Sequence, residues 1–182
     1  MNLIHKIDKQ NIFNFLKAEN IVKMINDDYI EIIEDNNQNK QDALYKVIIV
    51  GLNDNHKYWE VTPENSIYIK SSKPTEKVIL EQTDDILNII FIEMKSKNSK
   101  NIPKKFERTL SWLYLLLNLL DGKQNQKVKI YYVICKLSKA KNTTKKEKVQ
   151  IFSSTEIRYI KKWFYTINDN IMEISLNEIL GG

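Results

Sequence analysis

Hydrophobic side chains recur at two different spacings along this 182-residue chain, and the spacing separates predicted helices from predicted strands. Residues 9–25 carry apolar side chains three and four positions apart and contain neither Pro nor Gly, which predicts a helix. Residues 104–120 repeat this spacing after Pro103, which suits the first turn of a helix. Residues 154–164 are predicted as a further helix in the last part of the chain.

Runs rich in β-branched and aromatic residues predict strands between these helices. Residues 86–96 are almost wholly apolar up to Glu93, which is typical of a central strand buried on both faces. Asn53-Asp54-Asn55 and Asp84-Asp85 read as turns between neighbouring strands. Other predicted strands are residues 29–34, 45–52, 56–62, 66–71, 77–82, 127–137 and 149–152; residues 138–148 read as a lysine-rich loop, and the chain ends in a short strand or helix.

This pattern predicts one α/β domain over residues 1–182, a length usual for a single domain. The single cysteine, Cys135, excludes an intrachain disulfide, and two distant histidines, His5 and His56, argue against a histidine-based metal site. Glycine-rich phosphate-binding motifs are absent. The N-terminus lacks the apolar segment of a signal peptide, and the longest apolar run is too short to span a bilayer. We therefore expect a cytoplasmic protein with no membrane partner.

Charge is distributed unevenly along the chain. Residues 1–94 carry 10 basic and 16 acidic side chains, whereas residues 95–148 carry 15 basic and 3 acidic ones. The net charge thus changes from −6 to +12 between neighbouring segments, although the whole chain carries only +5. Such a basic segment is typical of a site for a polyanion, although a solvated basic surface without a ligand would give the same pattern.

Glu93 and Lys95 end the most apolar predicted strand. They are two residues apart, so on a strand they extend from the same face. Charges at the end of a buried strand are costly unless they are paired or bind a ligand. The two residues therefore form either a salt bridge at the rim of the sheet or part of a binding site.

The order helix, three strands, helix, strand, with Glu93-Met94-Lys95 closing the third strand, resembles the PD-(D/E)xK nuclease superfamily. Restriction endonucleases and many repair and defence nucleases share this core. The resemblance covers about residues 10–137, with residues 149–182 as a C-terminal extension. It implies a restriction-endonuclease-like core, in which helices flank a mixed central sheet in the order α-β-β-β-α-β.

The resemblance also implies an activity, which is divalent-metal-dependent hydrolysis of phosphodiester bonds in DNA, as in restriction or defence systems. Glu93 would bind Mg²⁺ or Mn²⁺ together with a second acid, and Lys95 would be the catalytic lysine that orients or activates the attacking water. Carboxylates, a divalent ion and a lysine suit this chemistry because together they stabilise the charge that develops on the phosphate.

The second acid departs from the family pattern, which prefers Asp after Pro or a small residue. If Asp84-Asp85 are the central residues of a two-residue turn, Thr83 pairs with Ile86 and Glu76 lies opposite Glu93. Directly opposed residues have Cβ atoms roughly 4.5–5.5 Å apart, close enough to share a metal. Glu76 is therefore the first choice, Glu81 is the alternative if the strands slip, and Asp84 is the third.

Lysines after the predicted strand are candidates for contacts with phosphates. The candidates are Lys97, Lys100, Lys104, Lys105, Arg108, Lys139, Lys141, Lys145 and Lys146. A chain this short has no obvious separate recognition module, so we expect a homodimer or a subunit of a larger complex. Two alternatives stay open: a catalytically inactive relative that binds nucleic acid or a protein partner, and a basic interaction domain without nuclease ancestry.

Overall fold

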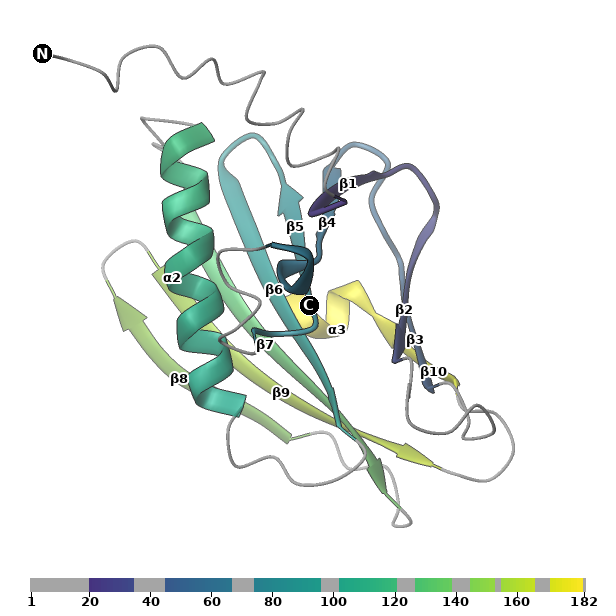
Figure 1. The fold of residues 1–182 in the computed structure, drawn as a ribbon. Helices are drawn as coiled ribbons and strands as arrows, with labels where there is room; N and C mark the ends of the chain where they lie inside the picture. The colour runs from purple at the N-terminus through teal and green to yellow at the C-terminus, as the bar shows by residue number, and fades with distance from the viewer. Residues whose placement is uncertain are drawn as a thin grey trace, which may run out of the picture.

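The computed structural model describes residues 20–34, 45–66, 74–95, 102–120, 127–138, 145–152, 155–165 and 171–181. Its elements are β1 (Val22–Ile25), β2 (Tyr29–Glu34), β3 (Tyr45–Val50), β4 (Lys57–Val61), η1 (Pro63–Asn65), β5 (Lys77–Gln82), β6 (Ile86–Lys95), α2 (Ile102–Leu120), β7 (Lys127–Ser138), β8 (Lys145–Phe152), β9 (Thr155–Tyr165), β10 (Ile171–Ser175) and α3 (Leu176–Leu180). They form a mixed α/β structure with two sheets (Figure 1).

The large sheet has the strand order β1-β4-β5-β6-β7-β9-β8. Strands β4, β5 and β6 form an antiparallel meander, and β7 then lies parallel to β6. Parallel neighbours need a crossover connection, which α2 supplies between β6 and β7. The described part of the predicted core therefore has three antiparallel strands, a helix and a parallel strand in that order.

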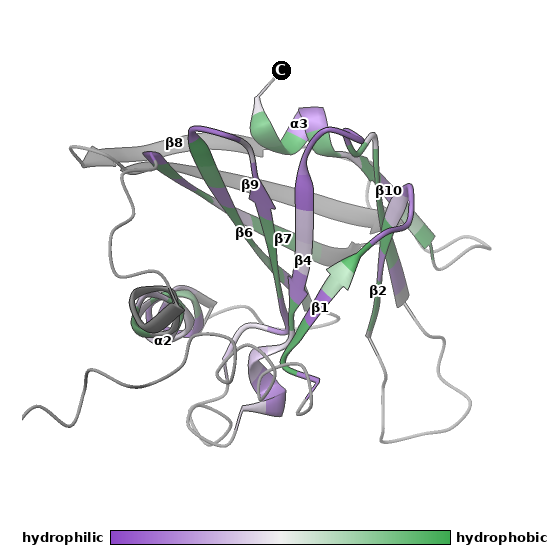
Figure 2. Ribbon diagram, turned by 90° about the horizontal axis from the view of Figure 1, so that it is seen from above, coloured by the Kyte–Doolittle hydropathy of each residue, from purple (hydrophilic) through white to green (hydrophobic). Residues whose placement is uncertain are grey.

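Two hydrophobic clusters lie on opposite faces of the large sheet. On one face, α2 buries Phe106 and Leu113 against Phe91 of β6, and Phe106 stacks on Tyr132 of β7 with ring centroids 4.5 Å apart. On the other face, the small sheet β10-β3-β2 and α3 cover the strands. Figure 2 shows α2 and α3 on opposite sides of the large sheet. No helix in the described part of the chain combines the length and hydropathy needed to cross a bilayer.

Several predicted elements agree closely with the structure. Strands β2 and β5 match their predicted bounds, and β6 and β7 differ from theirs by one residue each. The mixed α/β class is also confirmed. The predicted strand 66–71 and most of the predicted helix 9–25 lie outside the described residues.

Other predictions were wrong. Residues 22–25, predicted as the end of a helix, form β1, and Asn20 before them has a φ of 52°, which a right-handed helix does not accommodate. Residues 154–164 were predicted as a helix, but Thr155–Tyr165 is β9, because it gains hydrogen-bonded neighbours on both sides in β7 and β8. The predicted loop 138–148 ends early, since Lys145 already belongs to β8. Finally, β3 and β4 do not form a hairpin but lie in different sheets.

Candidate functional site

The β5–β6 hairpin has the register predicted from its turn. Lys77 pairs with Ile92, and the pairing continues without a shift to Gln82 and Leu87. At the turn, the Thr83 amide donates to the Ile86 carbonyl at 3.0 Å. Continued by one residue beyond β5, this register brings Glu76 opposite Glu93.

At this end of the hairpin, each of the two carboxylates accepts a hydrogen bond from a backbone amide on the opposite side. Oε2 of Glu76 accepts a hydrogen bond from the Met94 amide at 2.7 Å. Oε2 of Glu93 in turn accepts from the Glu76 amide at 3.4 Å. The Glu93 side chain is 0% exposed and lies on the face that α2 covers, together with Phe91. Glu93 is therefore a carboxylate where water is scarce, which is costly unless a cation accompanies it, whereas Glu76 is half-buried.

Lys105 of α2 supplies a positive charge at this position. Its Nζ lies 2.5 Å from Oε1 of Glu93, and its side chain is 16% exposed. Sequence reasoning assigned Lys105 to phosphate binding and missed this ion pair. The available signal was helical spacing, because Lys105 precedes buried Thr109 by four residues and so lies on the inward side of the helix.

A buried pair of threonines fixes the segment before β5 against α2. The Thr75 amide donates to Oγ1 of Thr109 at 2.9 Å, and the Thr109 hydroxyl donates to the Lys105 carbonyl at 2.8 Å. Both threonines are fully buried. Because Thr75 directly precedes Glu76, this contact helps to set the position of Glu76. Sequence reasoning did not identify these threonines.

The donor set at this site suits magnesium better than zinc. No three or more His, Cys, Asp or Glu side chains within the described ranges are grouped so that they could hold a metal. A metal bound at this site would have only the carboxylates of Glu76 and Glu93 as ligands from the described residues. Mg²⁺ is commonly bound by one or two carboxylates together with waters and substrate phosphates, whereas structural zinc sites require four protein ligands.

The structure separates Glu81 and Asp84 from this site. Glu81 pairs with Asn88 rather than with Glu93 and lies on the opposite face of the sheet, with Ile79 and Tyr58. Asp84 is exposed in the turn at the far end of the hairpin. Neither residue can share a metal with Glu93 in this register, so Glu76 is left as the second acid of the three that were considered.

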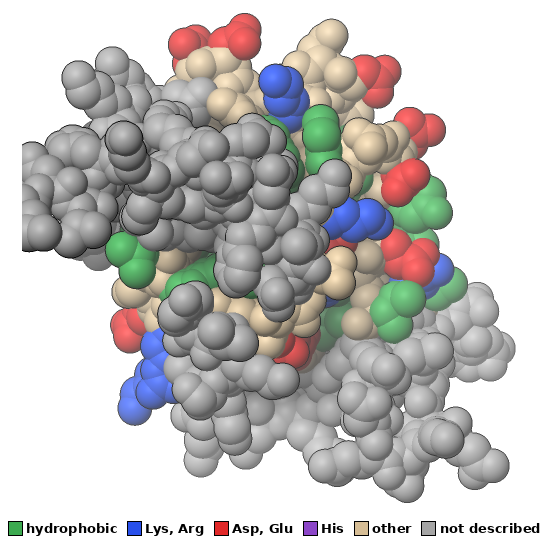
Figure 3. Space-filling view, turned by 45° about the horizontal axis from the view of Figure 1, so that its top comes forward, with side chains coloured by type: hydrophobic (Ala, Val, Ile, Leu, Met, Phe, Trp, Pro, Cys, Tyr) green, Lys and Arg blue, Asp and Glu red, His purple; other side chains and the backbone are tan. Residues whose placement is uncertain are grey.

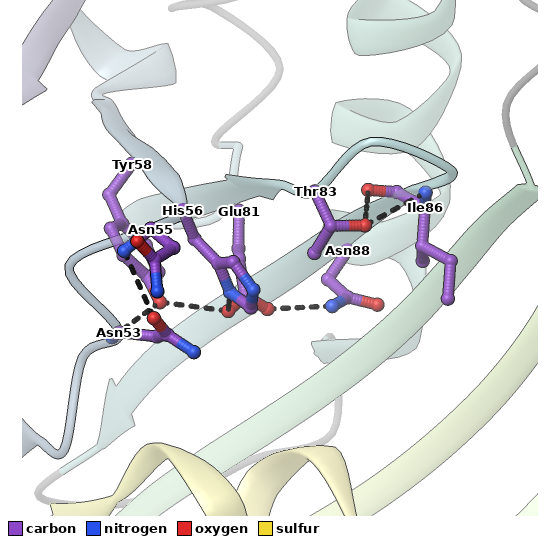
Figure 4. Close-up of polar contacts among 8 residues, drawn as sticks. All are labelled: Asn53, Asn55, His56, Tyr58, Glu81, Thr83, Ile86 and Asn88. Carbon is purple, nitrogen blue, oxygen red and sulfur yellow. Dashed lines mark hydrogen bonds and ion pairs between the residues drawn. The ribbon is translucent and has the colours of Figure 1, made fainter.

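Glu81 instead is the centre of a buried hydrogen-bond network (Figure 4). Its Oε1 accepts from the Tyr58 hydroxyl at 2.8 Å and bonds to Nδ1 of His56 at 2.9 Å, and its Oε2 accepts from Nδ2 of Asn88 at 2.6 Å. Burial raises the pKa of Tyr58 to about 12, and the contact with Glu81 adds to this rise, whereas the Asn53 amide opposes it. The network joins β4, β5 and β6, and sequence reasoning missed it.

The network opens to solvent on the side of His56. His56 and Tyr58 line a cavity of about 350 Å³, whose other walls include Asp28 of the β1–β2 turn and Asp54 of the β3–β4 turn. The side chain of His56 is 28% exposed, whereas that of Glu81 is only 1% exposed. Water can therefore reach the imidazole but not the carboxylate.

The structure describes only some of the predicted phosphate-binding residues. Lys104 and Arg108 are exposed on α2. Lys95 is the last residue of β6, two positions after Glu93, and Lys145 and Lys146 begin β8. Lys97, Lys100, Lys139 and Lys141 lie outside the described residues. On the face shown in Figure 3, basic and acidic side chains are intermixed, so its described residues form no continuous basic patch.

Comparisons of the chain with protein-family models, with curated proteins and with solved structures found no match. The features that bear on function are therefore the geometry of Glu76, Glu93 and Lys105 and the resemblance of the sequence pattern.

Proposed function

We propose that this protein is a divalent-metal-dependent nuclease with a restriction-endonuclease-like core. The observation that carries the proposal is the meeting of Glu76 and Glu93 at the end of the β5–β6 hairpin. The surrounding order of three antiparallel strands, a helix and a parallel strand supports it, because the resemblance places a metal-binding pair of acids on these two strands.

The carboxylates of Glu76 and Glu93 would hold Mg²⁺ or Mn²⁺, which supplies Lewis-acid stabilisation of the scissile phosphate and a more acidic water. Backbone amides already orient both carboxylates, so little reorganisation of the acids is needed to present their oxygens. Lys95 follows Glu93 by two positions on β6, and we assign it to the attacking water. An ammonium there would favour the deprotonated nucleophile and stabilise developing negative charge.

The substrate we propose is DNA. The segment 95–148, which carries a net charge of +12, begins at the end of β6 and includes the whole of α2. Exposed Lys104 and Arg108 project from the same helix that carries Lys105 to Glu93. Phosphate contacts of this kind give affinity without reading sequence, so selection of a target would need a second copy of the chain or another subunit.

One observation favours a second candidate, a catalytically inactive relative that binds nucleic acid or a protein partner. Glu93 is fully buried, and one of its oxygens already contacts Lys105. If that ion pair is permanent, it fastens α2 to β6 and leaves no room for a metal. Metal binding therefore separates the two candidates.

The test combines calorimetry and cleavage. Mn²⁺ and Mg²⁺ are titrated into the wild type, Glu93→Gln and Glu64→Gln, the last being the same substitution at an exposed residue. Each protein is then incubated with duplex DNA, single-stranded DNA and RNA in the presence of Mn²⁺. We expect wild type and Glu64→Gln to bind metal and to cleave DNA, and Glu93→Gln to lose both properties. Metal binding without cleavage of any nucleic acid, or no metal binding at all, would exclude the nuclease in favour of the inactive relative.

A further inference from the structure

Lys105 supplies a cation to Glu93, the buried member of the carboxylate pair. Oε1 of Glu93 contacts Nζ of Lys105 at 2.5 Å, while the other oxygen of Glu93 faces the amide of Glu76. A buried carboxylate needs a compensating charge, and the ammonium supplies it. A divalent cation shared by Glu93 and Glu76 would contact the same carboxylate group as this ammonium.

We propose that Lys105 is the resident counter-ion of the metal-free site and that a divalent cation displaces it from Glu93. This inference rests on the proposed function, because it requires the carboxylate pair to bind a metal. Two cations at one carboxylate oxygen repel each other strongly where the dielectric constant is low. Entry of the metal and departure of the ammonium are therefore coupled. The apparent affinity of the acids for metal is lower than their intrinsic affinity, because the ion pair must first be broken.

The position of Lys105 allows this movement. It lies near the N-terminal end of α2, and 16% of its side chain is exposed although Glu93 is fully buried. A lysine has a flexible four-carbon stem, so its ammonium can turn from the buried carboxylate to solvent without displacement of the helix. Exposed Lys104 and Arg108 lie on the same part of α2. A displaced Lys105 would join them and contact a phosphate of the substrate, so metal loading would strengthen the binding of DNA.

The test exploits two adjacent lysines on the same helix. Lys105→Met removes the charge but keeps an unbranched side chain of similar length, and Lys104→Met makes the same change at an exposed residue. Mn²⁺ affinity is measured by calorimetry at fixed ionic strength, and melting temperatures are measured in chelator and in Mn²⁺. A hydrogen bond to a charged group contributes enough free energy that its removal should tighten Mn²⁺ binding roughly 10- to 100-fold in Lys105→Met. Lys104→Met should bind like the wild type.

Stability gives a second readout that does not depend on activity. Lys105→Met should melt below the wild type in chelator, because buried Glu93 loses its ion pair with Lys105, and should regain the difference in Mn²⁺. If Lys105→Met is too unstable to measure, Lys105→Gln keeps a donor to Glu93 without the charge and should also bind Mn²⁺ more tightly than the wild type.

The outcomes separate this inference from the proposed function. Measurable binding to the wild type with equal or weaker binding to both Lys105 variants would overturn the counter-ion role and leave the metal site standing. Binding to the variants alone would show that metal does not displace Lys105 in the wild type; it would overturn the displacement and favour the inactive relative with a permanent ion pair. If neither the wild type nor the variants bind Mn²⁺, the proposed function itself fails, and the displacement mechanism fails with it.

Discussion

Replacement of Glu81 by Ala would remove the acceptor of three hydrogen bonds in the core. Tyr58 and Asn88 are buried and would keep a donor with no acceptor, whereas partly exposed His56 could turn to water. A buried donor left without an acceptor lowers the free energy of unfolding by about 1–3 kcal/mol, so the two together lower it by about 2–6 kcal/mol. Loss of the buried carboxylate returns part of this cost, because a charge no longer has to be desolvated. We expect a net destabilisation of about 2–4 kcal/mol, a large share of the roughly 5–15 kcal/mol that holds a typical domain folded.

Glu81→Gln should be much milder because of a detail at Asn88. The amide oxygen Oδ1 of Asn88 is buried and has no hydrogen-bond partner. Rotation of the Asn88 amide would bring this oxygen to the NH₂ group that the substitution introduces, while the oxygen of the new amide still accepts from Tyr58. The number of buried polar groups without a partner then does not rise, and we expect the free energy of unfolding to fall by at most about 1.5 kcal/mol.

Urea unfolding of the wild type and both variants, followed by circular dichroism, measures these differences as shifts in midpoint at constant slope. Mn²⁺ binding by Glu81→Gln should equal that of the wild type, because Glu81 and Glu93 lie on opposite faces of the sheet. Equal destabilisation by Ala and Gln would show that the charge matters and the acceptor does not. A neutral Ala variant would refute the network as a source of stability.

Three further predictions concern other buried groups and the proposed chemistry. Burial raises the pKa of both Tyr58 and Tyr132 to about 12, so the folded state keeps protons that the unfolded state loses above pH 10. The free energy of unfolding should therefore fall between about pH 10 and 12. Urea unfolding at each pH measures this fall, which should be less steep in Tyr132→Phe. Thr109→Val should lower the free energy of unfolding by about 1–3 kcal/mol because the buried Thr75 amide loses its acceptor, and Thr109→Ser should be nearly neutral; equal effects would contradict this role. Lys95→Ala should slow cleavage of DNA by about 10²–10³-fold with Mn²⁺ and DNA binding retained, and undiminished cleavage would remove Lys95 from the mechanism.

The sequence determined the central hairpin and the placement of the acids on it. The apolar run of β6, its turn at Asp84-Asp85 and the alternation of side chains are local properties, so they fixed the strand, its register and the face of each residue. Glu76 could therefore be placed opposite Glu93 before the fold was known. The same register separated Glu81 from them.

Tertiary structure decided the contacts that join distant segments. Residues 155–165 carry both helical and strand spacing, and only their position between β7 and β8 makes them a strand. Strand β10 pairs with β3, which lies more than a hundred residues earlier in the chain and which local patterns did not connect to it. Lys105 reaches Glu93 because the crossover helix packs on one particular face of the sheet. Helical spacing turns Lys105 inward, but the residue it meets depends on how two elements pack, and packing depends on the whole core.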